Sequence, residues 1–340
     1  MVLSKKFVIV KHFEGKPKSS DLALVEELLP LVKMGEFMIE AEYISIDPGM
    51  RQYSNLQAIG DVMFGLQLGK IVVSKNSKFP VGERIRGWYG WRTHTIIDPN
   101  KWEKHDFISE KPRVLPNFGE LSPSIGLGIL GMPGETAYFG LLEICQPKIG
   151  ETLVVSGAAG AVGSHVGQIG KIKGLNVIGI AGSDEKCKWL VDELGFDYAI
   201  NYKTQDLSEA LKNAAPNGID CYFDNVGGEI SSAVIFQMND FGRISVCGSI
   251  SCYNSEPQIS PMAKSIQFPI VCKQLKMEGF LVHRWENRYN ESFVDNYKWI
   301  QENKLILRET IYQGFENTFQ AFIGTLNGDN IGKTIVKLDS

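Results

Sequence analysis

The first third of the chain consists of short apolar and alternating stretches separated by glycine, proline and asparagine. Residues 36–46 and 69–73 are of this kind, and an earlier β-like stretch ends at His12. Runs of this length and punctuation are typical of strands in a barrel or sandwich. The pattern predicts a β-rich first domain.

The pattern changes near residue 131. Pro133 and Thr136 favour a helix start, and a helix-compatible run follows over residues 137–144. Apolar stretches at 152–156, 177–181, 220–224 and 242–247 then alternate with helical segments. Regular strand–helix alternation predicts a parallel, doubly wound sheet. Residues 330–337 again resemble a strand of the first third, and we expect them to return to the first domain.

A length of 340 residues favours about two domains. We expect a first domain of residues 1–124, completed by residues 308–340, and a second domain of residues 125–307. Hydrophobic residues make up 44% of the chain and the net charge is −4, with the positive residues scattered. This balance argues against nucleic-acid binding.

Neither a leader segment nor a run of about 20 apolar residues is visible, so we expect a cytoplasmic protein that does not enter a membrane. None of the six cysteines forms a C-x-x-C pair, and we expect free thiols, mostly in the core.

A glycine-rich turn follows the strand at 152–156 directly. Gly157, Gly160 and Gly163 have the spacing G-x-x-G-x-x-G and precede a helix-compatible run. Glycines let a pyrophosphate approach the amides of a helix N-terminus, where the helix dipole favours negative charge. The spacing departs from G-x-G-x-x-G, but within a series of strand–helix units it predicts dinucleotide binding.

The end of the next strand bears on which dinucleotide is bound. Asp184 lies 21 positions after Gly163, which is the distance expected of an acid that binds the ribose of NAD. It follows the small pair Gly182 and Ser183, however, and Lys186 supplies a cation that suits the 2′-phosphate of NADP. We favour NADPH, and spacing alone leaves NAD open.

Ligands for zinc are not apparent. Cysteine is absent before Cys145, and the histidines at 12, 94, 105, 165 and 283 are isolated from one another. Catalytic zinc needs about three ligands and an open position. Without a Lewis acid, plain alcohol oxidation is difficult, whereas hydride addition to a conjugated double bond spreads charge onto an oxygen that hydroxyls can stabilise. Tyr253, after a predicted strand, is the first candidate proton donor, and water is the alternative.

Seven segments together carry a resemblance to a known family. They are residues 45–51, 131–145, 158–163, 182–186, 201–204, 221–228 and 328–336. With them the chain resembles the medium-chain dehydrogenase/reductase superfamily, and within it the zinc-free group of 15-oxo-prostaglandin 13-reductases and alkenal reductases. The resemblance implies an α/β protein with a GroES-like β-rich domain and a Rossmann domain.

The resemblance also implies cofactor and catalytic residues. Lys186 and Tyr202 would hold the 2′-phosphate, and Tyr253 and Tyr53 would act at the substrate. The full set implied for NADPH/NADP is Gly157, Gly160, Ala161, Val162, Gly163, Lys186, Tyr202, Asn225, Cys247, Gly248, Ser249, Ile250, Ser251, Cys252, Tyr253, Phe280, Leu281, Val282 and Asn330. The implied reaction is NADPH-dependent reduction of enones, 2-alkenals and 15-oxo-prostaglandins, with NADP-dependent oxidation of leukotriene B4 as a further activity, by a homodimer of lipid metabolism.

Two segments depart from the family pattern. Gly49 stands where the family usually has tyrosine, which would widen one side of the substrate pocket, and residues 254–261 differ from the family's proline-rich loop. Two other interpretations stay open at this point. One is a zinc-free quinone oxidoreductase, and the other is a crystallin-like nucleotide-binding protein without catalysis.

Overall fold

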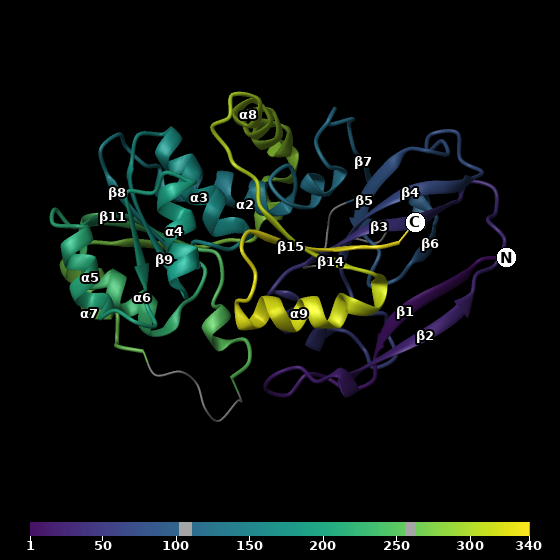
Figure 1. The fold of residues 1–340 in the computed structure, drawn as a ribbon, viewed down its shortest axis with the longest axis horizontal. Helices are drawn as coiled ribbons and strands as arrows, with labels where there is room; N and C mark the ends of the chain where they lie inside the picture. The colour runs from purple at the N-terminus through teal and green to yellow at the C-terminus, as the bar shows by residue number, and fades with distance from the viewer. Residues whose placement is uncertain (102–110, 256–262, 340) are drawn as a thin grey trace. The chain divides into compact units, whose positions relative to one another are not determined.

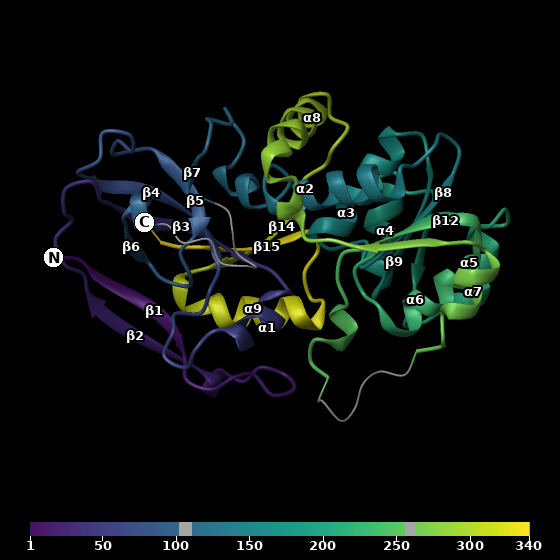
Figure 2. The same cartoon turned by 180° about the vertical axis from the view of Figure 1, so that it is seen from behind.

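The computed structural model describes residues 1–101, 111–255 and 263–339. The chain divides into two units. The first comprises Met1–Leu127, Glu309–Asp329 and the segment from Thr334 onward, and the second comprises Gly128–Arg308 and Asn330–Lys333. Both are drawn in Figures 1 and 2.

The first unit is built on strands, as the alternating pattern predicts. Its larger sheet has the order β14-β15-β3-β4-β5-β7, and β6 also pairs with β3. A separate antiparallel pair is formed by β1 and β2. The bounds are β1 Leu3–Ile9, β2 Leu22–Leu28, β3 Phe37–Ile46, β4 Leu66–Ser74, β5 Arg84–Trp88, β6 His94–Ile97, β7 Arg113–Val114, β14 Glu309–Gln313 and β15 Lys333–Lys337, with the helices α1 Met50–Tyr53 and α9 Thr318–Asn327.

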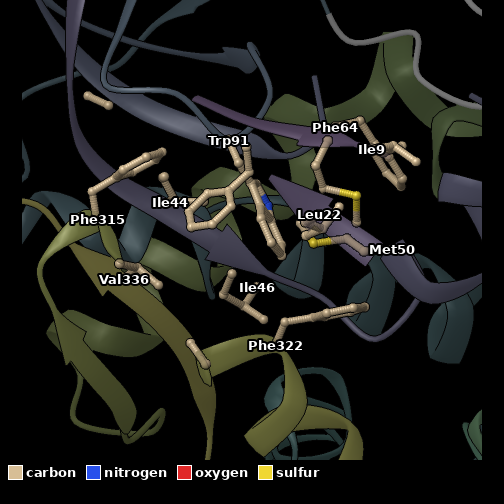
Figure 3. Packing of buried hydrophobic residues seen from close by; sticks show 14 of the residues in the cluster. Ile9, Leu22, Ile44, Ile46, Met50, Phe64, Trp91, Phe315, Phe322 and Val336 are labelled. Atoms are coloured by element: carbon tan, nitrogen blue, oxygen red, sulfur yellow. The ribbon is translucent and has the colours of Figure 1, made fainter. Parts of the chain in front are cut away.

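Aromatic and sulfur side chains fill the core of this unit (Figure 3). Trp91 is fully buried and makes edge contacts with Phe7 and Phe322, whose ring centroids lie 5.9 and 5.7 Å away. Ile44 and Ile46 come from β3, and Met50 comes from α1. Burial of α1 residues in this core fixes the start of the segment that carries Tyr53.

The second unit is a six-stranded parallel sheet with the order β10-β9-β8-β11-β12-β13. This is the doubly wound arrangement that the strand–helix alternation predicts. The bounds are β8 Thr152–Ser156, β9 Asn176–Ala181, β10 Tyr198–Asn201, β11 Ile219–Asp224, β12 Met238–Val246 and β13 Lys276–Gly279. All five residues of β8 are buried, because helices cover both faces of a parallel sheet.

Helices lie on both faces of this sheet. The helices α5, α6 and α7 bury apolar residues against one face and lie close together in both cartoon views. The helix α3 packs closely on β8 and β9, since a Cβ at Gly170 would lie 2.8 Å from a methyl group of Leu153. The bounds are α2 Met132–Phe139, α3 Ala161–Ile172, α4 Asp184–Asp192, α5 Leu207–Ala214, α6 Gly228–Ile235, α7 Gln267–Cys272 and α8 Tyr289–Gln301.

The structure corrects several local predictions. The helix expected to open at Pro133 and Thr136 and to run through residue 144 begins one residue earlier, at Met132, and continues as a π-helix over Gly140–Cys145. The last strand begins at Lys333 rather than at residue 330, and the first ends at Ile9 rather than at His12. In each case the structure shifts an end of the element, where sequence signals are weakest.

The cysteines are free, but the expectation that most lie in the core is wrong. Cys145 and Cys221 are buried, Cys272 is exposed at the end of α7, and the other three are half-buried. Within the described ranges, the search for an apolar helix of membrane-spanning length finds none.

Candidate functional site

The glycine-rich turn joins β8 to α3. Gly157 has φ +59°, a left-handed conformation that glycine adopts without strain. A Cβ at Gly163 would lie 2.4 Å from the carbonyl oxygen of Gly157, so this position has no room for a side chain. Gly160 caps α3 and offers no side-chain acceptor to the first amides, those of Ala161, Val162 and Gly163. Amides of this kind bind phosphate oxygens, so the turn fits a pyrophosphate.

The ends of β9 and β10 meet at the same edge of the sheet, with Asn201 opposite Ala181. Beyond β9 the chain continues as Gly182 and Ser183, and the Ser183 hydroxyl accepts a hydrogen bond from the Lys186 amide at 3.3 Å. Tyr202 is 42% exposed. Its ring lies over Gly182, where a Cβ would be 3.2 Å from Tyr202 Cε1.

The spacing from Gly163 makes Asp184 the candidate acid for binding the ribose of NAD. In the structure its carboxylate accepts a hydrogen bond of 2.6 Å from the side-chain amide of Asn201. Asp184 is also the first residue of α4, one position beyond the cap, rather than the last residue of β9. The place of an NAD-type acid at the strand end is taken by small residues, an arrangement that leaves room for a phosphate.

A buried carboxylate organises the end of β11. Asp224 is 2% exposed, and its Oδ1 accepts hydrogen bonds from the hydroxyls of Ser156 and Tyr222 at 3.0 and 2.8 Å. The amides of Val226 and Gly227 donate to the same oxygen. Burial beside this carboxylate raises the pKa of Tyr222 well above its ordinary value, so its phenol stays protonated and donates.

Asn225 is held by Ser156. The Asn225 amide donates to the Ser156 hydroxyl at 2.9 Å, and its side-chain amide donates to the Ser156 carbonyl at 2.8 Å. A Cβ at Gly157 would lie 3.4 Å from the Asn225 Cβ. The structure therefore brings Asn225 against the glycine-rich turn.

The segment 247–253 packs on the turn that follows β11. The amides of Cys247 and Gly248 donate to the Asp224 carbonyl, and the Ser251 hydroxyl donates to the Val226 carbonyl at 2.6 Å. Ile250 and Cys252 form a short 3₁₀ turn within it. All seven predicted residues of this segment thus lie at the carboxyl end of the sheet, where open α/β proteins bind ligands.

Tyr253 folds back over its own segment. Its hydroxyl lies 3.5 Å from the Ser249 amide, and a Cβ at Gly248 would be 3.0 Å from the same oxygen. The Tyr253 hydroxyl can therefore occupy this position because Gly248 has no side chain.

The remaining predicted cofactor residues lie on two other segments. The half-buried ring of Phe280 makes edge contacts with Phe223 and Trp285. Leu281 is 41% exposed, and Val282 begins the 3₁₀ segment Val282–Arg288.

Asn330 belongs to a short segment that adheres to the glycine-rich turn. Its side chain donates to the Gly332 carbonyl at 2.8 Å, and the Gly332 amide donates to the Ala159 carbonyl at 2.8 Å. Gly160 and Gly332 form a parallel bridge. Residues far apart in sequence are thus adjacent at this turn.

Tyr53 lies in the first unit, at the end of α1. Its ring makes an edge contact with Phe64, with centroids 6.3 Å apart. A Cβ at Gly49 would be 3.2 Å from Tyr53 Cε2. Residues 254 and 255 of the departing loop are described, and the rest of it, 256–261, lies outside the described residues.

Sequence reasoning missed Ser156, Asp224 and Gly332, whose contacts build this edge of the sheet. An acid at the end of an apolar strand was a usable signal for Asp224. Gly332 and Ser156 had no local signal, because their role lies in contacts with distant segments.

The distribution of metal-ligating side chains bears on the zinc question. Among the described residues, no group of three or more His, Cys, Asp and Glu is placed to hold a metal ion. His105 lies outside the described residues. His165 is buried within α3, and His12 is exposed.

Two family models match the chain. Residues 5–105 match "N-terminal domain of oxidoreductase", and residues 161–299 match "Zinc-binding dehydrogenase".

Curated relatives align with nearly the whole chain. Prostaglandin reductase 1 of Bos taurus is 50% identical, with 99% of this chain and 100% of the relative covered. The NADP(+)-dependent 2-alkenal reductase of Nicotiana tabacum is 38% identical, covering 98% of this chain and 97% of the relative. The crystal structure of CurA from Vibrio vulnificus in complex with NADPH is 38% identical with a TM-score of 0.90, covering 99% of each chain.

Proposed function

The chain belongs to the prostaglandin reductase 1 family of the medium-chain dehydrogenase/reductase superfamily, and we propose that it reduces the carbon–carbon double bond of α,β-unsaturated ketones and aldehydes with NADPH. The observation that carries the proposal is the convergence of the glycine-rich turn, Asn225 and the Tyr253 segment at one edge of the sheet. Relatives named as reductases of prostaglandins and 2-alkenals support this substrate class.

We propose that the cofactor lies along this edge. Gly157 and Gly160 to Gly163 would bind the pyrophosphate, and Lys186 and Tyr202 would hold the 2′-phosphate. The nicotinamide, its ribose and the remaining cofactor edge would contact Asn225, the segment 247–253, residues 280–282 and Asn330.

When bound at this edge, NADPH would supply a hydride for the β-carbon of the substrate. Conjugation would carry the negative charge to the carbonyl oxygen, where hydrogen-bond donors can stabilise it. In the proposed mechanism Tyr253 gives a proton to the α-carbon, which completes the saturated product, and Tyr53 borders the substrate. The turn that holds Tyr253 is fixed by hydrogen bonds to the β11 end, so the phenol is positioned before substrate arrives.

Substrates of this class include lipid-derived 2-alkenals and 15-oxo-prostaglandins, and a separate activity with NADP⁺ as hydride acceptor would oxidise an alcohol of leukotriene B4 to a ketone. The direct test incubates the protein with NADPH and either trans-2-nonenal or 3-nonen-2-one. We expect NADPH consumption and a saturated product in equal amounts. Absence of NADPH consumption with both substrates would overturn the proposal.

Adding 1,2-naphthoquinone as a third substrate to this assay separates two alternative functions from the proposed one. A quinone oxidoreductase of this fold would turn over 1,2-naphthoquinone much faster than the alkenal. A crystallin-like protein would bind NADPH and turn over neither. The ordered Tyr253 segment favours the reductase.

The wider setting is also a proposal. We propose a cytoplasmic homodimer active in lipid metabolism, with residues 1–124 and 308–340 forming the substrate domain and residues 125–307 the cofactor domain. β13 supports dimerisation, since it ends the six-stranded sheet with an edge that β12 alone pairs among the described strands. Sedimentation equilibrium would give twice the chain mass, and a mass of 37.8 kDa would contradict the dimer.

A further inference from the structure

Lys203 lies at the sheet edge where the proposed 2′-phosphate site is. It is the second residue after β10, and β10 pairs in parallel with β9 so that Asn201 is opposite Ala181. A Cβ at Gly182 would lie 3.3 Å from Lys203 Cε, close to the 3.2 Å found for Tyr202 Cε1. The side chains of Tyr202 and Lys203 therefore both reach back over the small residue that follows β9.

The backbone of Lys203 is fixed by hydrogen bonds. Its amide donates to Asn201 Oδ1 at 3.1 Å, and the Asn201 side chain donates in turn to Asp184 Oδ1 at 2.6 Å. The Asn201 amide donates to the Gln205 side chain at 2.8 Å. Asn201 is 5% exposed, so this turn is anchored in the sheet edge and tied to the first turn of α4.

In the described part of the chain, no carboxylate neutralises the ammonium of Lys203. Of the carboxylates in the described ranges, none lies within salt-bridge distance of Lys203 Nζ, whereas Lys171 on the same unit pairs with Asp197 at 2.7 Å. Asp184, the nearest acid along this hydrogen-bond chain, is already engaged by Asn201. An exposed cation held over a small residue, at the N-terminal end of α4, is suited to a dianion.

We infer that Lys203 is a second cation, beside Lys186, for the 2′-phosphate of NADPH, and that it helps to select NADPH over NADH. This inference rests on the proposed function. It assigns the exclusion of NADH to residues that follow two neighbouring strands, since Lys186 lies after β9, in α4, and Lys203 lies after β10. Asn201 acts as a positioning residue, because it fixes the turn that carries Lys203.

The test is calorimetric titration of the protein with 2′,5′-ADP and with 5′-AMP, which differ only in the 2′-phosphate. The variants are Lys203→Met and Lys186→Met. Lys188→Met is the matched control, because Lys188 is an exposed lysine of α4, the helix that also carries Lys186. Methionine keeps the apolar stem and removes the charge. We expect Lys203→Met to weaken 2′,5′-ADP binding roughly tenfold, as the loss of one charged hydrogen bond would, and to leave 5′-AMP binding unchanged.

The outcomes separate the two proposals. If the unmodified protein does not prefer 2′,5′-ADP to 5′-AMP, the NADPH assignment itself fails. If it does, and Lys203→Met binds 2′,5′-ADP as tightly as Lys188→Met does, Lys203 is a solvated surface residue and the inference is overturned. Equal weakening of both ligands would also overturn it, because 5′-AMP has no 2′-phosphate and a contact to that group cannot affect its binding.

Discussion

The Tyr253 hydroxyl lies against the backbone of Gly248 and Ser249. If it donates the proton in the reaction, Tyr253→Phe should lower kcat about a hundredfold and leave KM for NADPH nearly unchanged. Steady-state kinetics with 3-nonen-2-one measures both constants.

Tyr198→Phe is the control, because Tyr198 is an exposed tyrosine on β10 of the same unit. An unchanged kcat for Tyr253→Phe would assign the proton to water. A raised KM for NADPH with normal kcat would instead show that Tyr253 only binds the cofactor.

His165 makes folding stability depend on pH. Burial lowers the pKa of its imidazole to about 3 from an ordinary 6.5. The unfolded chain takes up a proton below pH 6.5 and the folded chain does not until near pH 3, so stability is lost as the pH falls through this window. From pH 7 to pH 5 this residue removes about 2 kcal/mol from the free energy of unfolding.

Urea unfolding at both pH values measures the effect. His165→Gln should lose about 2 kcal/mol less between pH 7 and pH 5 than the unmodified protein, whatever its absolute stability. His12→Gln, at an exposed histidine, should keep the full dependence. Identical pH dependence in His165→Gln and the unmodified protein would show that His165 is not buried as described.

At the scale of elements, the segment before β15 depends on a residue without a side chain. Gly332 has φ +70°, and a Cβ there would lie 2.0 Å from the carbonyl oxygen of Arg308. Gly332→Ala must move the segment that bonds to the glycine-rich turn. We expect it to cost about 3 kcal/mol or more, from a left-handed alanine plus a backbone clash, and to weaken NADP⁺ binding.

Gly35→Ala is a matched control for the conformational part. Gly35 has φ +86°, but nothing lies within 4 Å of a Cβ at that position. This variant should cost only about 1–2 kcal/mol, and it should leave NADP⁺ affinity unchanged. Chemical denaturation and NADP⁺ titration of both variants test the comparison, and equal destabilisation would contradict the proposed clash at Gly332.

For the molecule as a whole, the proposed chemistry needs no metal. Dialysis against EDTA, followed by metal analysis, should therefore leave turnover of trans-2-nonenal unchanged. Loss of activity that Zn²⁺ restores would refute this prediction. It would instead indicate a zinc enzyme, as in the name of the family model that matches residues 161–299, "Zinc-binding dehydrogenase".

The order of strands and helices could be predicted because each depends on local periodicity. The pattern at 152–156 gave β8 with its bounds, and the glycines after it marked the cofactor turn. Element ends were less predictable. The helix expected to open at Pro133 begins one residue earlier, at Met132, because the extended conformation of Gly131, not hydrophobic periodicity, sets that end.

Within the site, residues that belong to a local sequence motif could be predicted. Residues whose role depends on contacts between different strands could not. Ser156 and Asp224 are 68 positions apart and meet only because β8 and β11 are neighbours in the sheet. The NAD alternative stayed open for the same reason. Spacing along the chain identified Asp184 as an acid near the end of β9, but it could not show that the Asn201 side chain donates a hydrogen bond to its carboxylate.

By itself the sequence determined the two kinds of domain, the strand–helix alternation and the glycine-rich turn, because these follow from periodicity and from backbone conformations that glycine permits. Tertiary structure alone decided which polar groups meet: the hydrogen bonds at Asp224, the attachment of Gly332 to the turn, and the position of Lys203 over Gly182. The physical reason is that hydrogen bonds and ion pairs act over a few ångströms in space, and distance along the chain does not fix distance in the folded protein.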